Sequence, residues 1–178
     1  MDKGPIILKD KPVLGISACC FGSPVRYNGK ALDLVKGIGR EKSDFRWCPV
    51  CPENTAGLGV PRDPIHLVGD TGRAVWGQGG RVVSRGGQDV TAAMIAGAEE
   101  SLQTLERAGA RVFIYMDGSP SCGVHRIYDG SFSGRKIRGA GAATELLRQH
   151  GLTVYSESDM TEARLQQLIE EDIRRDSV

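Results

Sequence analysis

The sequence predicts an α/β fold: a single domain in which a mostly parallel sheet carries helices on both faces, as in Rossmann-like proteins. Short apolar runs with β-branched and aromatic residues, typical of buried strands, recur at residues 13–18, 45–50, 112–116 and 152–155. Helical patterns precede the third run, separate the last two and follow the final one. Strand and helix therefore alternate, which favours parallel strands joined by crossover helices.

Each predicted helix has a recognisable beginning or end. We expect Asp89 to cap the first helix and Gly109 to end it, because glycine tolerates the left-handed conformation. The second helix is expected over residues 140–150. The third begins near Asp159 and Glu162, which have capping-box spacing. The apolar stripes that would pack on the sheet are Ile95, Ala98, Leu102 and Leu105 in the first helix and Leu165, Leu168, Ile169 and Ile173 in the third.

The stretch at 54–87 differs from the rest because glycine and proline interrupt it repeatedly. Its short apolar runs are expected to form small antiparallel strands around tight turns, at 65–68, 74–76 and 81–83. We interpret this stretch as an excursion from the main sheet that covers one side of the site. The whole chain, 1–178, is then one domain.

Composition and charge exclude several classes of function. Lys and Arg total 23 and Asp and Glu total 22, so the formal net charge is +1 and gives no support to binding of nucleic acid or a membrane surface. The longest apolar runs are far shorter than the roughly 20 residues needed to span a bilayer. The first residues lack an apolar stretch of signal-peptide length. We therefore expect a cytoplasmic protein, and the sequence does not predict its oligomeric state.

Three predicted strands each end in a loop that contains cysteine. The first is followed by Cys19 and Cys20, the second by Cys51, and the third by the turn around Cys122. In an open parallel sheet, ligands bind outside the carboxyl ends of the strands. Five cysteines in a cytosolic protein are also more typical of metal binding or catalysis than of disulfides. A metal site at one edge of the sheet is therefore a hypothesis, and ordinary surface turns are the alternative.

Simpler cysteine motifs fit this pattern poorly. Cys48 and Cys51 form a CxxC, but a zinc knuckle needs a second pair of similar spacing. A thioredoxin-like CxxC should open a helix, whereas Pro52 and Glu53 are expected to lead into the glycine-rich stretch. A ferredoxin-type motif would place its cysteines in one short run. Cysteines from three separate loops fit a cluster that is held by the tertiary fold.

A set of short motifs, in order along the chain, resembles the bacterial family that contains 2-thiouracil desulfidase. The resemblance extends from about residue 14 to residue 157. The motifs are Ile16-Ser17-Ala18-Cys19, Val25-Arg26-Tyr27-Asn28-Gly29, Cys51-Pro52-Glu53, Gly87-Gln88-Asp89-Val90-Thr91, Ser119-Pro120-Ser121-Cys122-Gly123, Ile127-Tyr128-Asp129-Gly130 and Phe132-Ser133-Gly134.

This resemblance implies a cytoplasmic α/β domain that carries a [4Fe-4S] cluster, with one iron open to substrate sulfur. By position, its ligands would be Cys19, Cys51 and Cys122. Cys20 and Cys48 stand where the family pattern does not require cysteine, so we interpret them as bystanders.

Two further positions carry over from the family as catalytic residues. Glu53 looks like the family's acidic catalytic residue, with a solvated surface carboxylate as the alternative. Ser119 looks like its proton-handling hydroxyl, with a hydroxyl that only caps the turn as the alternative. The sequence departs from the family at 116–118, before the Ser-Pro-Ser-Cys-Gly motif, and at 54–56, after Glu53. These departures concern the identity of the substrate more than cluster binding.

The implied activity is removal of sulfur from a thiolated pyrimidine, either 2-thiouracil or a thiouridine derivative, to give the oxo-base and hydrosulfide. Arg26 is a candidate partner for the phosphate of a nucleotide substrate, and a loop anchor is its alternative role. Two other functions stay open at this point. One is a non-catalytic zinc- or cluster-binding module with Cys20 or Cys48 as a fourth ligand, and the other is a cluster-dependent sulfur-transfer enzyme.

Overall fold

A computed structural model describes residues 13–21, 45–68, 71–115 and 117–176. Its centre is a four-stranded parallel sheet in the order β2-β1-β5-β8. The strands are β1 (Val13–Ser17), β2 (Arg46–Val50), β5 (Val112–Tyr115) and β8 (Thr153–Ser156). The four predicted strands are therefore confirmed, and so is the α/β fold class. Arg26 lies outside the described residues.

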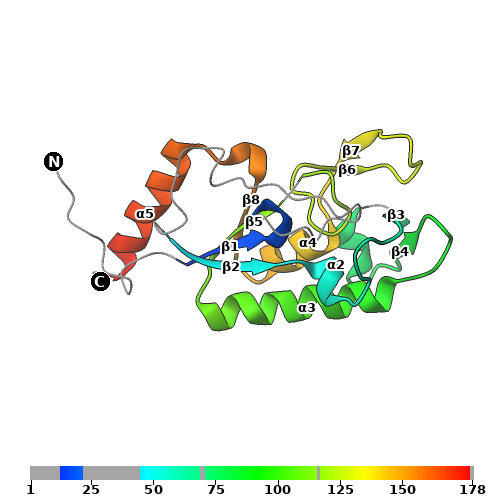
Figure 1. Ribbon diagram of the computed structural model, residues 1–178, viewed down its shortest axis with the longest axis horizontal. Coiled ribbons are helices and arrows are strands. Elements are labelled where there is room, and N and C mark those ends of the chain that lie inside the picture. The colour runs from blue at the N-terminus through cyan, green and yellow to red at the C-terminus, as the bar shows by residue number, and fades with distance from the viewer. Residues whose placement is uncertain (1–12, 22–44, 69–70, 116, 177–178) are drawn as a thin grey trace.

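The central strand β5 shows why both faces of the sheet carry helices. All four of its residues are buried, and successive side chains of a strand point to opposite faces. Phe113 and Tyr115 belong to the core beneath α3 (Thr91–Ala108) and α4 (Ala142–Gln149). Val112 and Ile114 belong to the core of the other face, where α5 (Glu162–Asp176) packs. Figure 1 shows α3 along one side of the sheet and α5 away from it on the other.

The ends of α3 follow the sequence closely. Val90 occupies the N-cap position, one residue after the predicted cap. The Asp89 carboxylate still accepts the backbone N–H and the hydroxyl of Thr91. Gly109 ends the helix in the left-handed conformation, with φ of 77°, as glycine allows.

The predicted capping box at the start of α5 is wrong. The Asp159 carboxylate accepts the backbone N–H of Ser156 and contacts His125 Nε2. Asp159 thus completes a capping box for the preceding 3-10 turn, Glu157–Asp159. At the start of α5, Thr161 Oγ1 accepts the backbone N–H of Arg164 instead.

The excursion contains one antiparallel hairpin, formed by β3 (Ile65–Val68) and β4 (Arg81–Ser84). The strand predicted at 74–76 is wrong, because Gly72–Val75 form a 3-10 turn. This turn packs against the start of α4, where the Trp76 indole N–H donates to the Ala142 carbonyl at 2.8 Å. A tertiary contact therefore decides the conformation of this segment.

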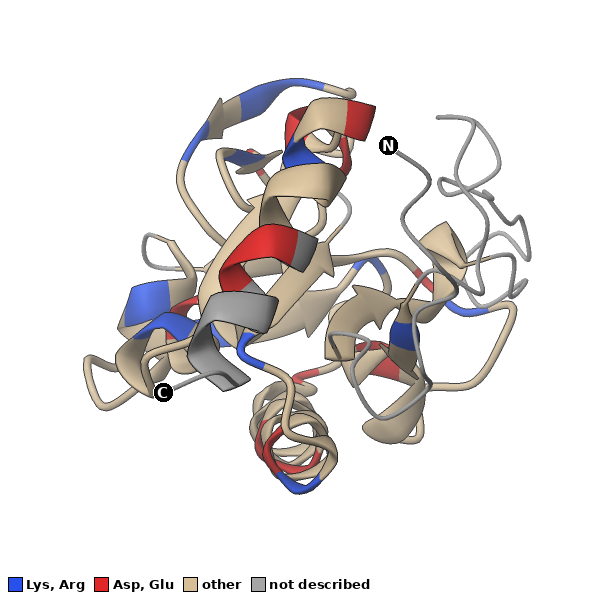
Figure 2. Cartoon of the chain, turned by 90° about the vertical axis from the view of Figure 1, so that its left-hand side faces the viewer, with Lys and Arg blue, Asp and Glu red and all other residues tan. Residues whose placement is uncertain are grey.

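A second hairpin, β6 (Arg126–Tyr128) and β7 (Lys136–Arg138), was not predicted. It lies beside the loop that follows β5, with Gly118 bridged to Ile127. Figure 2, which looks at the molecule from the side of α5, shows both basic and acidic residues on the side that faces the viewer. Among the described residues, no helix has the length and apolar character needed to cross a membrane.

Candidate functional site

A cavity of about 350 Å³ lies at the carboxyl ends of β1, β2 and β5. Cys19, Cys51 and Cys122 all line it. Each follows the end of a different strand, and adjacent parallel strands end at the same edge of a sheet. The structure therefore brings together the three thiols that the sequence places in separate loops. Glu53 and Ser119 line the same cavity.

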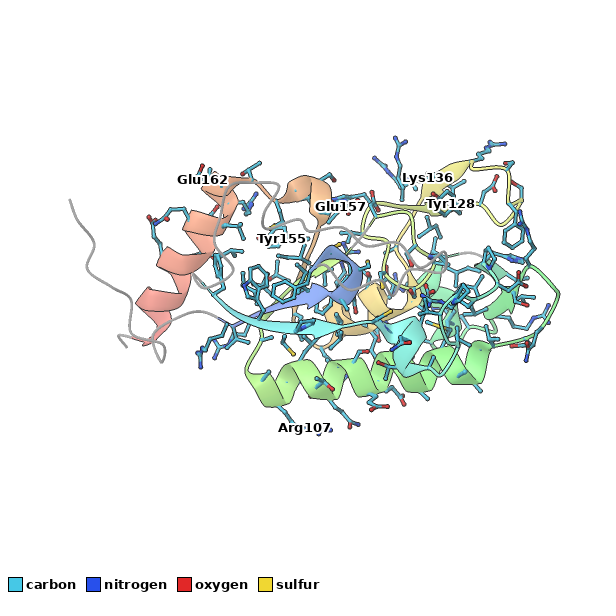
Figure 3. The ribbon with its side chains drawn as sticks, viewed as in Figure 1. Arg107, Tyr128, Lys136, Tyr155, Glu157 and Glu162 are labelled. Carbon is cyan, nitrogen blue, oxygen red and sulfur yellow. The ribbon has the colours of Figure 1, made fainter. Side chains whose placement is uncertain are left out.

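Asp117 organises the loop that carries Cys122. Its Oδ1 accepts three successive backbone N–H groups, from Val124, His125 and Arg126, at 3.0 to 3.2 Å. Its own N–H donates to the carboxylate of Glu157 at 2.6 Å, a residue labelled in Figure 3. The chain after β5 is thus turned back on itself and fixed to the end of β8.

The start of α4 holds the same loop from the other side. The Ala142 and Ala143 N–H groups donate to the carbonyls of Pro120 and Ser121, and the Thr144 hydroxyl donates to the Cys122 carbonyl at 3.0 Å. The first amides of a helix have no partner within the helix itself. Here they pair with the carbonyls of the cysteine loop, so the position of Cys122 depends on α4.

A one-turn helix, α2 (Pro52–Thr55), begins directly after Cys51. The expectation that Pro52 and Glu53 lead directly into the glycine-rich stretch is therefore wrong. Pro52 occupies the first turn, where its missing N–H costs nothing, and Cys51 is extended at the N-cap. The turn directs the Glu53 side chain into the cavity.

The Glu53 carboxylate is held through both of its oxygens. Arg62 contacts Oε2 through Nε at 2.7 Å and through Nη2 at 2.6 Å. The Ser121 hydroxyl donates to Oε1 at 2.7 Å, and the Ser119 hydroxyl donates to it at 3.3 Å. The carboxylate is therefore fixed in one orientation, with only 12 % of its side chain exposed.

Ser119 and Ser121 connect Glu53 to the cysteine loop. Ser119 Oγ accepts the backbone N–H groups of Ser121 and Cys122, both at 3.2 Å, so it also closes the turn. Ser121 Oγ lies 2.9 Å from Ser119 Oγ and 3.2 Å from Cys122 Sγ. A chain of hydroxyls therefore runs from the carboxylate to a thiol.

The electrostatics of the cavity favour a cation between the cysteines. Burial raises the pKa of Cys51. Burial, followed by the charges of Glu53 and Cys51, raises the pKa of Cys122 well above its ordinary value. Cys51, Cys122 and Glu53, each of which is anionic when deprotonated, thus lie close together in this cavity. A metal centre binds cysteine as thiolate and displaces these protons, so the donor set suits an iron cluster.

A buried hydroxyl nearby also fits a sulfur-rich group. Among the described residues, Tyr115 Oη has no hydrogen-bond partner. Burial, followed by the charges of Cys122 and Cys51, raises the pKa of Tyr115 well above its ordinary value. The charges of two of the three cysteines therefore act on the Tyr115 hydroxyl. Unpaired donors are costly when buried, and hydrogen bonds to sulfur tune Fe–S centres.

The spacing of the donors differs from that of a single-ion site. In the described part of the chain, no three His, Cys, Asp or Glu side chains are arranged to hold one metal ion. In a cubane cluster each thiolate binds a different iron, so its ligands need not converge on one point. Cys48 packs with the core of the α3 face, Cys20 is fully buried, and neither lines the cavity. The geometry therefore gives a zinc site with Cys20 or Cys48 as fourth ligand no support.

Sequence reasoning missed Arg62 and Ser121, both of which contact Glu53. Ser121 stands inside the Ser-Pro-Ser-Cys-Gly motif, and its position next to Cys122 was the available signal. Arg62 lies in the glycine- and proline-rich stretch, where no pattern marks it. Tyr128, for which no role is predicted from the sequence, lines the cavity from the hairpin side and is labelled in Figure 3.

Fold and site together define an α/β enzyme with a cysteine-lined cofactor site at the carboxyl edge of its sheet. The chain belongs to the 2-thiouracil desulfurase family, whose model matches residues 14–159.

The chain is similar to two proteins, and each match spans nearly the whole length of the other protein. The uncharacterized protein YbbK of Bacillus subtilis (strain 168) is 36% identical over 149 residues, which is 83% of this chain and 97% of YbbK. The solved structure of TudS, a [4Fe-4S]-dependent thiouracil desulfidase, is 35% identical with a TM-score of 0.74. That likeness covers 90% of this chain and 99% of TudS.

Proposed function

We propose that this protein is a [4Fe-4S]-dependent desulfidase that removes sulfur from a thiolated pyrimidine, 2-thiouracil or a thiouridine derivative, and releases hydrosulfide. One observation carries the proposal: Cys19, Cys51 and Cys122 line one cavity with Glu53, in a chain of the 2-thiouracil desulfurase family. TudS, which is [4Fe-4S]-dependent and acts on thiouracil, supports the same cofactor and substrate class.

The three cysteines would hold the cluster as thiolates. When bound, the cluster would supply an iron without a protein ligand, a Lewis acid that prefers sulfur. Ser17 Oγ lies 3.1 Å from Cys19 Sγ, and Ser121 Oγ lies 3.2 Å from Cys122 Sγ. The Ser17 hydroxyl can donate a hydrogen bond to the Cys19 thiolate, and such contacts orient the ligands of metal centres. The single proton of the Ser121 hydroxyl is donated to Glu53 Oε1, so Ser121 contacts Cys122 without donating to it.

Glu53 and Ser119 would move the protons of the reaction. Glu53, as general base, takes a proton from water as the oxygen attacks the thiocarbonyl carbon. The carbon–oxygen bond forms, the carbon–sulfur bond breaks, and Ser119 passes a proton toward a ring nitrogen. Water plus thiocarbonyl gives carbonyl plus hydrogen sulfide, so no electron donor or acceptor is needed.

The cavity suits a flat heterocycle. A volume of about 350 Å³ lies at the low end of the range for small-molecule sites. Phe132 and Tyr128 line its wall, and aromatic faces can stack on a pyrimidine. Arg26 would contact the phosphate of a nucleotide substrate. Free thiols and an oxygen-sensitive cluster both favour the reducing cytoplasm.

Anaerobic purification with iron and sulfide counting tests the proposal. We expect about four irons per chain and release of sulfide from 2-thiouracil or a thiouridine compound. Cys122→Ala should lose the iron, whereas Glu53→Ala should keep the brown colour and lose turnover. Exposed Arg107, labelled in Figure 3, offers Arg107→Gln as a control with wild-type iron and activity. Zinc in place of iron, or full activity of Glu53→Ala, would contradict the proposal.

A further inference from the structure

A nearly buried arginine in the wall of the cavity takes no part in the steps above. Only 6 % of the Arg62 side chain is exposed. Burying a guanidinium is costly unless its nitrogens are paired. Nε and Nη2 contact Glu53 Oε2, and Nη1 donates to the Gly59 carbonyl at 2.8 Å. Each of its three nitrogens therefore has a partner between residues 53 and 59.

This arrangement makes the two oxygens of Glu53 inequivalent. Oε2 receives two contacts from the guanidinium, while Oε1 receives the hydroxyls of Ser121 and Ser119. The plane of the carboxylate is consequently fixed from both ends. The contacts on Oε2 come from a charged guanidinium, and charge-assisted hydrogen bonds are about twice as strong as neutral ones. Oε1 accepts only neutral hydroxyls, so it is the oxygen that we expect to take a proton from water.

We propose that Arg62 is a positioning residue for desulfidation: it holds Glu53 Oε2 so that Oε1 faces the cavity and accepts the proton. This inference rests on the proposed function. Arg62 acts through Glu53 and is not itself assigned a contact with substrate. This role needs both Nε and Nη2 of the rigid guanidinium to contact Oε2. Lysine, with a single point charge on a flexible side chain, should therefore replace Arg62 poorly.

Steady-state kinetics of Arg62→Ala and Arg62→Lys in the iron-loaded enzyme test this role. Misplacing a reacting group by about 1 Å can cost about a hundredfold in rate. We therefore expect kcat to fall about tenfold to a hundredfold in both variants, while KM stays within about twofold. Added guanidinium ion should restore part of kcat in Arg62→Ala. The surface variant Arg107→Gln should match the wild type, with or without guanidinium.

Iron content and the visible absorption spectrum supply the readout that is independent of activity. Both should equal the wild type in Arg62→Ala, and binding of the product uracil, measured by calorimetry, should be unchanged. Iron that falls in step with kcat would overturn the role, because Arg62 would then hold the fold. A wild-type kcat in Arg62→Ala, or KM rising while kcat is kept, would overturn it equally.

The wild type separates this inference from the function on which it rests. Wild-type protein with about four irons that releases no sulfide from any thiolated pyrimidine would overturn both. Wild-type turnover together with an insensitive Arg62→Ala would overturn the role of Arg62 alone.

Discussion

At the scale of single residues, the site depends on short polar contacts that join acid, hydroxyl and sulfur. Ser121 makes the central one, since its Oγ lies 2.7 Å from Glu53 Oε1 and 3.2 Å from Cys122 Sγ. A change of protonation or charge at the Glu53 carboxylate therefore affects the Cys122 sulfur, and the reverse also holds. Low local dielectric strengthens such contacts.

Asp117 acts at the same scale but on the backbone. Burial alone would raise its pKa, but the N–H groups of Arg126, His125 and Val124 outweigh burial, and the pKa of Asp117 lies below its ordinary value. A group whose pKa is lower in the folded state stabilises the fold above its unfolded pKa. That contribution is lost as the pH falls through the folded pKa.

Asp117→Asn should therefore destabilise the protein at pH 7 and not at low pH. The expected loss is about 1 kcal/mol, since the carboxylate is partly exposed and its hydrogen bonds are screened by solvent. The difference in the free energy of unfolding between the wild type and Asp117→Asn should shrink below about pH 4, where free aspartate becomes protonated. Urea denaturation of both proteins across this range measures it. Asp63→Asn, outside this loop, is the comparison variant. A loss of stability in Asp117→Asn that does not depend on pH would contradict this role of the Asp117 carboxylate.

At the scale of elements, the site depends on two places where a glycine allows the backbones of neighbouring segments to approach closely. α2 and α3 meet at Gly97, where a Cβ atom would clash with the Pro52 carbonyl and approach the Ala56 Cβ to 2.8 Å. α4 approaches the cysteine loop in the same way at Gly141, whose Cβ would lie 2.7 Å from the Cys122 nitrogen. Glycine at these two contacts sets the positions of Glu53 and Cys122.

Gly97→Ala should displace α2 and with it Glu53. Overpacking of this kind typically costs about 1 to 3 kcal/mol, partly offset by the better helix propensity of alanine. We expect lower stability in urea and a lower kcat, with iron retained. Ala96→Leu, on the exposed side of the same helix, should leave kcat unchanged. Wild-type kcat in Gly97→Ala would show that α2 does not depend on this contact.

At the scale of the whole molecule, two cores on opposite faces of one sheet hold the strand ends in register. The three cysteines come from the ends of three neighbouring strands, so a bound cluster would link segments more than 100 residues apart in the sequence. A ligand that binds only the folded state stabilises it. The cluster should therefore act on the stability of the entire domain and not only on the cavity.

Removal of iron by a chelator should lower Tm by several degrees in anaerobic scanning calorimetry. For a domain of this size, each kcal/mol of stabilisation corresponds to roughly 2 to 4 °C in Tm. Cys122→Ala should show a low Tm that chelation does not change. Equal Tm values for the wild type with and without iron would mean that the three loops are not joined by a common group.

The sequence alone determined the four strands of the central sheet, the helices α3, α4 and α5, and which strand ends are followed by cysteine. Apolar runs predict where buried strands lie, and Gly109 ends α3 through local backbone energetics that need no tertiary context. The parallel order of strands then brings Cys19, Cys51 and Cys122 to one edge, because crossover connections return the chain in the same direction.

Only the tertiary structure decided what surrounds the cysteines. The segment at 74–76 has the apolar character of a strand, yet its contact with α4 makes it part of a 3-10 turn. The capping acid Asp159 was redirected by Ser156 and His125. Arg62 reaches Glu53 from nine residues away through an irregular loop. Local propensity cannot predict these contacts, because a side chain's partner depends on the elements that pack beside it, and here that choice sets the orientation of the proposed catalytic carboxylate.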